Sequence, residues 1–157
     1  MRKTVSPKVV LCDLDGVVWL AHQPIPGSVR AIASLREAGI RVVFVTNNSF
    51  STYDEQVTAL GLIGIPAEGD IVTSAMSAAT AMKSGWRVLV CGSRGLIEEV
   101  GRKTKDVVVA YNEPMASGNF DAVVVGFHRE FNFQVLTEYK SLNGFFHQAI
   151  CQNLLVW

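Results

Sequence analysis

Short runs of apolar residues alternate along the chain with segments whose apolar positions repeat at helical spacing. The apolar runs predict strands at residues 9–12, 42–45, 88–91, 107–110 and 122–125. Helical spacing predicts helices at about residues 28–38, 51–64, 74–82 and 96–100. An apolar run without polar alternation is typical of a strand covered on both faces, and we expect this of residues 9–12. The alternation of strands and helices predicts an α/β fold with a parallel sheet.

The first predicted helix has recognisable ends. Ser28 is a residue type that often caps a helix N-terminus, and Gly39 fits the position just after the last turn. The pattern of strands and helices then begins again near residues 71–74. We therefore expect two domains, with residues 1–72 forming the N-terminal part of a core domain and residues 73–157 forming part of a second, inserted α/β domain.

Two carboxylates one residue apart, Asp13 and Asp15, end the first apolar run and are followed by Gly16. Open α/β sheets bind their ligands at the carboxyl ends of strands. Close carboxylates repel each other unless a cation or a shared proton lies between them. Such a pair suits phosphoryl transfer assisted by Mg²⁺, with Asp13 as the nucleophile and Asp15 as the general acid and base. Gly16 would let the backbone approach a phosphate group closely.

A second polar cluster, Thr46-Asn47-Asn48-Ser49, ends the second apolar run. A right-handed crossover makes the first two strands neighbours, so we expect Thr46 beside Asp13. The Thr46 hydroxyl is then a candidate ligand for a phosphoryl oxygen. The side chains of Asn47 and Asn48 are candidates for binding phosphate or substrate.

Each motif also has an interpretation without chemistry. Asp13-Leu14-Asp15-Gly16 alone also fits a turn closed by an aspartate side chain, and the second polar cluster also fits a capped loop. An EF-hand is excluded because Val17 stands at a ligand position and Pro24 replaces the final glutamate. Catalysis is favoured because both polar clusters end consecutive apolar strands.

Other polar residues give weaker signals. Gly92-Ser93-Arg94-Gly95 fits an anion-binding helix start, but it fits a plain tight turn better. His128 follows another predicted strand, and we expect it at the surface. The cysteines Cys12, Cys91 and Cys151 are far apart and have no metal-binding spacing, so we expect small buried hydrophobic residues at Cys12 and Cys91.

Composition narrows the function classes. The chain has 157 residues, with 14 basic and 14 acidic side chains and a formal net charge of +0. No bulk charge therefore favours nucleic acid or an anionic membrane. No apolar stretch approaches the length of a membrane span, and the apolar run near the start is too short for a signal peptide. The odd number of scattered cysteines is typical of a reducing compartment, so we expect a cytoplasmic protein. From the balanced charge and the short apolar stretches, we expect it to bind neither nucleic acid nor membrane.

Together these motifs resemble the haloacid dehalogenase superfamily, and most closely its subfamily IIA, which includes NagD-like, 4-nitrophenyl-phosphatase-like and phosphoglycolate-phosphatase-like enzymes. The resemblance covers about residues 9–142 and is specific, because several motifs occur in the right order. In chain order the matching segments are Asp13-Leu14-Asp15-Gly16-Val17-Val18-Trp19, Pro24-Ile25-Pro26-Gly27, Thr46-Asn47-Asn48-Ser49, Val72-Thr73-Ser74, Gly92-Ser93-Arg94-Gly95-Leu96 and Val125-Gly126-Phe127-His128-Arg129.

The resemblance implies a partial Rossmann-like parallel-sheet core with a partial inserted α/β cap domain. It also implies a phosphatase that acts on a small phosphorylated metabolite through an aspartyl-phosphate. Asp13 would be the nucleophile, Asp15 the general acid and base, Thr46 the phosphate ligand and Asn47 a ligand of substrate or phosphate. The Asp13 carboxylate and the Asp15 backbone carbonyl would hold Mg²⁺.

The chain also departs from the family pattern. The family continues into a third motif with a lysine and a fourth with further acidic Mg²⁺ ligands. Here no aspartate follows Asp121, and Lys140 is the only late lysine. We therefore expect a truncated family member with little or no activity by itself.

Two competing hypotheses remain open. The first is a non-catalytic fragment that associates, including with copies of itself, through an exposed apolar C-terminal region. The second is a receiver-like module with an acidic pocket, which ranks last because receivers have neither the Pro24-Ile25-Pro26-Gly27 loop nor the cluster that begins at Thr46.

Overall fold

The structure is a computed structural model that describes residues 7–110, 119–129 and 149–151. The chain forms two compact units. The first comprises Met1–Thr46 and Tyr53–Val72, and the second comprises Asn47–Thr52 and Thr73–Trp157. Among the described residues, no helix is long and apolar enough to cross a bilayer.

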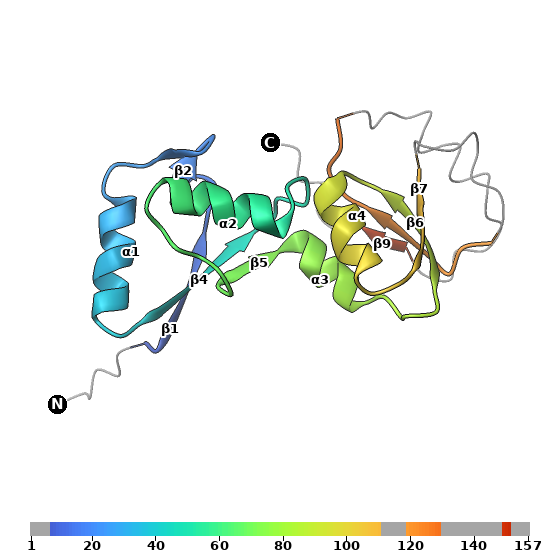
Figure 1. Ribbon diagram of the computed structural model, residues 1–157, viewed down its shortest axis with the longest axis horizontal. Coiled ribbons are helices and arrows are strands. Elements are labelled where there is room, and N and C mark those ends of the chain that lie inside the picture. Colours follow the sequence, from blue (N-terminus) through green and yellow to red (C-terminus); the bar gives the residue numbers. More distant parts are fainter. Residues whose placement is uncertain (1–6, 111–118, 130–148, 152–157) are drawn as a thin grey trace. The chain divides into compact units, whose positions relative to one another are not determined.

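The first unit is a small sheet with two helices (Figure 1). Its elements in chain order are β1 (Val9–Asp13), β2 (Trp19–Leu20), β3 (Gln23–Pro24), α1 (Ser28–Glu37), β4 (Arg41–Thr46), α2 (Tyr53–Leu62) and β5 (Ile71–Thr73), whose last residue already belongs to the second unit. The strand order is β1-β4-β5, and β1 and β4 are parallel, with Asp13 opposite Val45. β2 and β3 form a short antiparallel hairpin.

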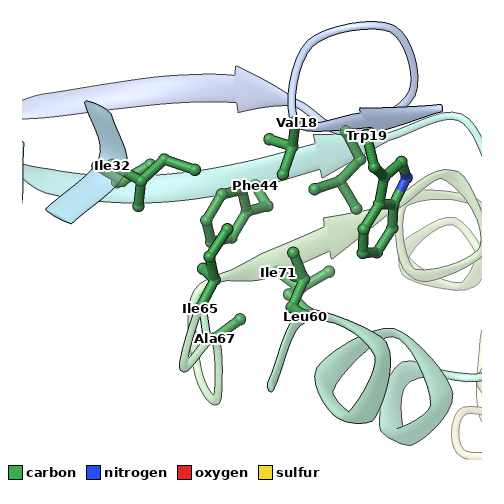
Figure 2. Packing of buried hydrophobic residues seen from close by; sticks show 10 residues of the cluster. Val18, Trp19, Ile32, Phe44, Leu60, Ile65, Ala67 and Ile71 are labelled. Carbon is green, nitrogen blue, oxygen red and sulfur yellow. The ribbon is translucent and has the colours of Figure 1, made fainter. Parts of the chain in front are cut away.

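The core of the first unit lies on one face of this sheet. Ile32 from α1 and Leu60 from α2 belong to the same buried cluster as Val42 and Phe44 from β4. Figure 2 shows the Phe44 ring within this cluster. Both helices therefore contribute to the cluster that contains the side chains of Val42 and Phe44.

The expectation that β1 is buried on both faces is wrong. Leu11 is 72% exposed and Val9 is 47% exposed, whereas Val10 and Cys12 on the opposite face are half-buried. Val45, which shares the open face with Asp13, is 37% exposed. Successive residues of a strand point to opposite faces, and the buried cluster described above forms on only one of them.

The N-terminus of α1 also differs from the prediction, whereas its C-terminus agrees with it. Gly27, with φ of 89°, occupies the N-cap position, and no side chain caps the helix. Ser28 is the first helical residue, and its hydroxyl donates instead to the carbonyl of Val18 at 2.8 Å. Gly39 has φ of 75° directly after the C-cap residue Ala38, which confirms the predicted C-terminal glycine.

The second unit is built on a parallel sheet. Its elements are α3 (Ser74–Thr80), β6 (Arg87–Cys91), α4 (Arg94–Gly101), β7 (Asp106–Val109), β8 (Ala122–Val125) and β9 (Ala149–Cys151). The strand order is β7-β6-β8-β9, and every neighbouring pair is parallel. The predicted α/β class with parallel sheets is therefore confirmed.

β6 is an inner, buried strand of this unit. Val88 and Val90 pack on one face with Leu96 and Val100 of α4, while Leu89 packs in a separate cluster. This strand has the two-sided burial that its uninterrupted apolar run predicts.

Two further strands, β5 and β9, had no predicted counterpart. The apolar C-terminal region that was predicted to associate extends to residues 152–157, and these lie outside the described part of the chain.

Candidate active site

Asp13 is the last residue of β1 and lies at the carboxyl end of the first sheet. Its side chain is exposed, and its Oδ1 accepts a hydrogen bond from the backbone N–H of Leu14 at 2.9 Å. This bond fixes one carboxylate oxygen at the point where the chain leaves the strand. An exposed carboxylate held in this way is a suitable nucleophile for an incoming phosphoryl group.

Asp15 lies in a tight loop between β1 and β2. The Leu14 carbonyl accepts hydrogen bonds from the backbone N–H groups of Val18 and Trp19, at 2.9 and 3.1 Å. Gly16 has φ of 86°, a conformation that a residue with a side chain adopts only with strain, and its N–H donates to the Trp19 carbonyl at 2.8 Å. The loop therefore requires glycine at position 16 for its backbone conformation.

Trp19 is a site residue that sequence reasoning did not identify. Its indole Nε1 donates to Asp15 Oδ1 at 3.0 Å, and its side chain is 1% exposed. The signal in the sequence was a tryptophan next to an apolar run, since a buried indole N–H normally finds an acceptor. The nearest acidic side chain in sequence, Asp15, provides it.

Thr46 is the last residue of β4 and is 3% exposed. The register places Val45 opposite Asp13, so Thr46 lies one residue beyond Asp13 at the same edge of the sheet. Side chains alternate along β4, and Thr46 follows Val42 and Phe44 on the buried face. Asp13 and Thr46 therefore share the carboxyl edge of the sheet but start from opposite faces of it.

Asn47 and Asn48 belong to the second unit. Asn48 Oδ1 accepts hydrogen bonds from the backbone N–H groups of Phe50 and Ser51, at 2.8 and 3.2 Å. This is the arrangement of a turn closed by an asparagine side chain. The Asn47 side chain is exposed, so it is the better placed of the two for binding a ligand.

The donor set at Asp13 and Asp15 fits Mg²⁺. A carboxylate and a backbone carbonyl are hard oxygen ligands, and Mg²⁺ in proteins retains several waters and needs only one or two carboxylates. Among the described residues, no three His, Cys, Asp or Glu side chains gather in one place. A Mg²⁺ ion bound by this part of the chain would therefore take most of its ligands from water or substrate.

Cys12 precedes the candidate nucleophile. Burial, and to a lesser degree the charge of Asp13, raise the pKa of the Cys12 thiol. Burial alone raises the pKa of Cys91 to about 12. Both side chains therefore stay neutral thiols near neutral pH. The small buried hydrophobic residue predicted at Cys91 is confirmed, because its side chain is fully buried. Cys12, for which the same was predicted, is only half-buried.

Two weaker candidates from the sequence remain, residues 92–95 and His128. Ser93 is the N-cap residue of α4, and the N–H of Gly95 donates to the Phe50 carbonyl at 3.1 Å, so this amide holds a neighbouring loop. His128, expected at the surface, is only 9% exposed. It lies three residues after the end of β8.

Comparison with known proteins identifies the family. The family model described as "Haloacid dehalogenase-like hydrolase" matches residues 10–103. The chain belongs to this family, as its motifs predict.

Individual relatives are phosphatases. The chain is 41% identical over 96 residues to D-glycerol 3-phosphate phosphatase of Mycobacterium tuberculosis, covering 58% of this chain and 26% of the relative. It is 35% identical over 118 residues to 4-nitrophenylphosphatase of Schizosaccharomyces pombe, covering 64% and 40%. The chain therefore spans less than half the length of these two relatives.

Solved structures show the same fold. The p-nitrophenyl phosphatase from Archaeoglobus fulgidus matches with a TM-score of 0.76 and 25% identity, over 95% of this chain and 56% of that one. The glycerol phosphate phosphatase from Mycobacterium tuberculosis in complex with magnesium matches with a TM-score of 0.67 and 32% identity, over 87% and 41%. The family and the α/β fold are thus established.

Proposed function

We propose that this chain carries the nucleophile and the phosphate ligand of a Mg²⁺-dependent phosphatase that acts on a small phosphorylated metabolite. The observation that carries the proposal is the pair Asp13 and Asp15 at the end of β1, with Asp15 tied to the buried Trp19. The phosphatase relatives and the magnesium complex of one of them support the reaction class.

The chemistry proceeds in two displacements. The Asp13 carboxylate attacks phosphorus, the bond to the leaving oxygen breaks, and Asp15 donates a proton to that oxygen. Asp15 then takes a proton from a water that attacks the aspartyl-phosphate, and inorganic phosphate leaves while Asp13 is regenerated. The Thr46 hydroxyl donates to a phosphoryl oxygen throughout. Bound Mg²⁺ would offset the negative charge of the phosphoryl group.

Asp15 suits its role because its position is fixed. A general acid must lie within hydrogen-bonding reach of the leaving oxygen, and the Trp19 bond limits the rotation of the carboxylate. Gly16 follows without a side chain, and a Cβ built there meets no atom within 4 Å, so space for a phosphoryl group exists beside its backbone.

The domain roles follow from the family. We assign residues 1–72 to the N-terminal part of the hydrolase core and residues 73–157 to part of an α/β cap domain. We also propose a reducing, cytoplasmic location, which the three widely separated cysteines of the sequence favour.

The test is release of 4-nitrophenol from 4-nitrophenyl phosphate, with Mg²⁺ and after its removal by a chelator. Asp13→Asn should abolish release, and Asp15→Asn should slow it strongly. Asp54→Asn is the matched control, because Asp54 is an exposed acid in the first turn of α2. Full activity in Asp13→Asn would show that another group is the nucleophile.

A second candidate, a non-catalytic fragment that associates, is favoured by the open face of β1. Leu11 and Val9 on this face are 72% and 47% exposed, which is unusual for neighbouring apolar side chains in a folded monomer. Light scattering during size-exclusion chromatography tests this candidate. A monomer that hydrolyses the ester would exclude it, and an inactive oligomer would favour it over the phosphatase.

A further inference from the structure

The segment Asn47–Thr52 follows the last residue of β4 directly but belongs to the second unit. The boundary between units therefore falls inside the candidate phosphate-binding motif, between Thr46 and Asn47. At its start the segment is held by Ser74, the first residue of α3, whose Oγ donates to the Asn47 carbonyl at 2.8 Å. This bond fixes the backbone of the residue whose side chain is the exposed candidate ligand.

The middle of the segment lies against the start of α4. The N–H of Gly95 donates to the carbonyl of Phe50 at 3.1 Å. A Cβ built on Gly95 would lie 2.2 Å from the backbone oxygen of Ser51 and 2.8 Å from that of Ser49. Backbone atoms cannot withdraw as a flexible side chain can, so only glycine permits this approach.

A second glycine permits a similar approach from the end of β8. Ser49 is 7% exposed, and its Oγ accepts a hydrogen bond from the N–H of Phe127 at 3.2 Å. A Cβ built on Gly126 would lie 2.9 Å from Ser49 Oγ and 2.8 Å from Leu96 Cδ2. A Cβ at position 126 would therefore require the side chains of Ser49 and Leu96 to shift.

The ring of Phe50 adds side-chain contacts to the same anchor. It meets Phe127 edge to face with ring centroids 5.9 Å apart. The guanidinium carbons of Arg94 and Arg129 lie 5.0 and 5.5 Å from its centroid. Aromatic and cation–π contacts of this kind stabilise the position of the ring in addition to the backbone bonds.

We infer that the second unit acts as a clamp on the substrate-binding loop, with Ser49, Gly95 and Gly126 as positioning residues for Asn47 and Asn48. The clamp fixes both ends of the Asn47–Phe50 stretch, so the asparagine side chains extend from a backbone with little freedom. Because the role of the asparagines is itself part of the proposed function, the inference rests on it. The clamp makes substrate affinity depend on residues that do not touch the substrate.

The decisive variant is Gly95→Ala, with Gly101→Ala as its matched control. Both glycines lie in α4, but a Cβ on Gly101 meets no atom within 4 Å. Hydrogen exchange measured by mass spectrometry should show exchange of peptides covering residues 47–52 rising at least about tenfold in Gly95→Ala, and peptides from β1 and β4 should be unchanged. Gly101→Ala should match the wild type throughout.

Kinetics separate positioning from a purely structural role. In Gly95→Ala the KM for 4-nitrophenyl phosphate should rise about tenfold with a smaller change in kcat, as expected when binding groups are misplaced. Ser74→Ala, which loses one hydrogen bond at a half-exposed position, should raise KM about two- to tenfold and remain folded.

The outcomes distinguish the inference from the proposed function. Unchanged exchange of residues 47–52 in Gly95→Ala overturns the clamp, and so does faster exchange with an unchanged KM. If the wild type hydrolyses no ester, the proposed function is overturned. If residues 47–52 then still lose protection in Gly95→Ala and not in Gly101→Ala, the clamp is supported. Ser49→Ala serves as the second variant if Gly95→Ala fails to fold, and it should raise exchange of the same peptides.

Discussion

The indole Nε1 of Trp19 donates a hydrogen bond to Oδ1 of Asp15 at 3.0 Å, and the ring itself is 1% exposed. The second carboxylate of the candidate site is therefore attached to the core of the first unit. The Asp15 side chain is exposed, but its orientation is set by a side chain that solvent does not reach. The geometry of the candidate site and the core packing of the first unit are coupled at this one bond.

Trp19→Phe should impair catalysis and stability together. Phenylalanine keeps much of the apolar ring but has no N–H, so the bond to Asp15 is lost. A hydrogen bond to a charged group contributes about 1.5–3 kcal/mol, and we expect a fall in the free energy of unfolding at the lower end of this range. The kcat for 4-nitrophenyl phosphate should fall about tenfold as the Asp15 carboxylate gains freedom. Urea unfolding and steady-state kinetics measure the two effects.

The matched control is Trp86→Phe. Trp86 is a half-buried tryptophan of the second unit, and its ring lies 5.2 Å from Lys83 Nζ. If Trp19→Phe and Trp86→Phe reduce kcat equally, the indole bond to Asp15 has no special role in catalysis.

Thr46→Val and Thr46→Ser should differ sharply. Valine has nearly the shape of threonine without the hydroxyl, and serine keeps the hydroxyl without the methyl group. Loss of a hydrogen bond to a charged phosphoryl oxygen should lower kcat/KM about 10- to 100-fold in Thr46→Val. Thr46→Ser should retain most of the activity, although it loses one methyl group at a side chain that is 3% exposed. Equal kinetics of the two variants would mean that the hydroxyl does not contact the phosphoryl group.

Much of the fold was predictable because its strands are short apolar runs and its helices have clear periods. β4 and β6 agree with prediction within a residue or two, since uninterrupted runs bounded by polar residues leave little choice. The same reasoning gave the wrong burial for β1. Four consecutive apolar residues do not reveal whether an element covers each face, and for Leu11 one face is open.

The candidate site was predictable in its residues and less so in its contacts. Asp13 and Thr46 follow from strand ends, which the apolar pattern places. The bond from Trp19 to Asp15 depends on a loop whose path requires a positive φ at Gly16, and local sequence does not give that path. The need for glycine at Gly95 was likewise hidden, because the backbone it approaches lies far away in sequence.

Leu11→Lys should leave the folded state nearly unchanged. Leu11 is 72% exposed, so the substitution should change the free energy of unfolding by less than about 0.5 kcal/mol. Phe44→Ala on the covered face of β4 should cost about 3–5 kcal/mol, because Phe44 is fully buried. Urea unfolding compares the two.

The same substitution tests association through the open face. A charged side chain at position 11 should lower any concentration-dependent oligomer seen by light scattering, because it interrupts the apolar surface shared with Val9 and Val45. An oligomer that persists in Leu11→Lys would place the contact elsewhere.

Cys91 should make the protein less stable at alkaline pH. Burial raises the pKa of its thiol to about 12 from an ordinary value of 9.0, so the thiol ionises in the unfolded chain before it does in the folded one. The unfolded state then releases the proton first, and the free energy of unfolding falls as pH rises from 9 towards 12. At about pH 10.5 the loss should be about 2 kcal/mol relative to pH 8.

The control is Cys91→Ala, which has no thiol to ionise. Its unfolding free energy should fall about 2 kcal/mol less over the same interval, although it starts lower because a cavity replaces the sulfur. Parallel pH dependence of the two proteins in urea titrations would show that the thiol is not the group that titrates.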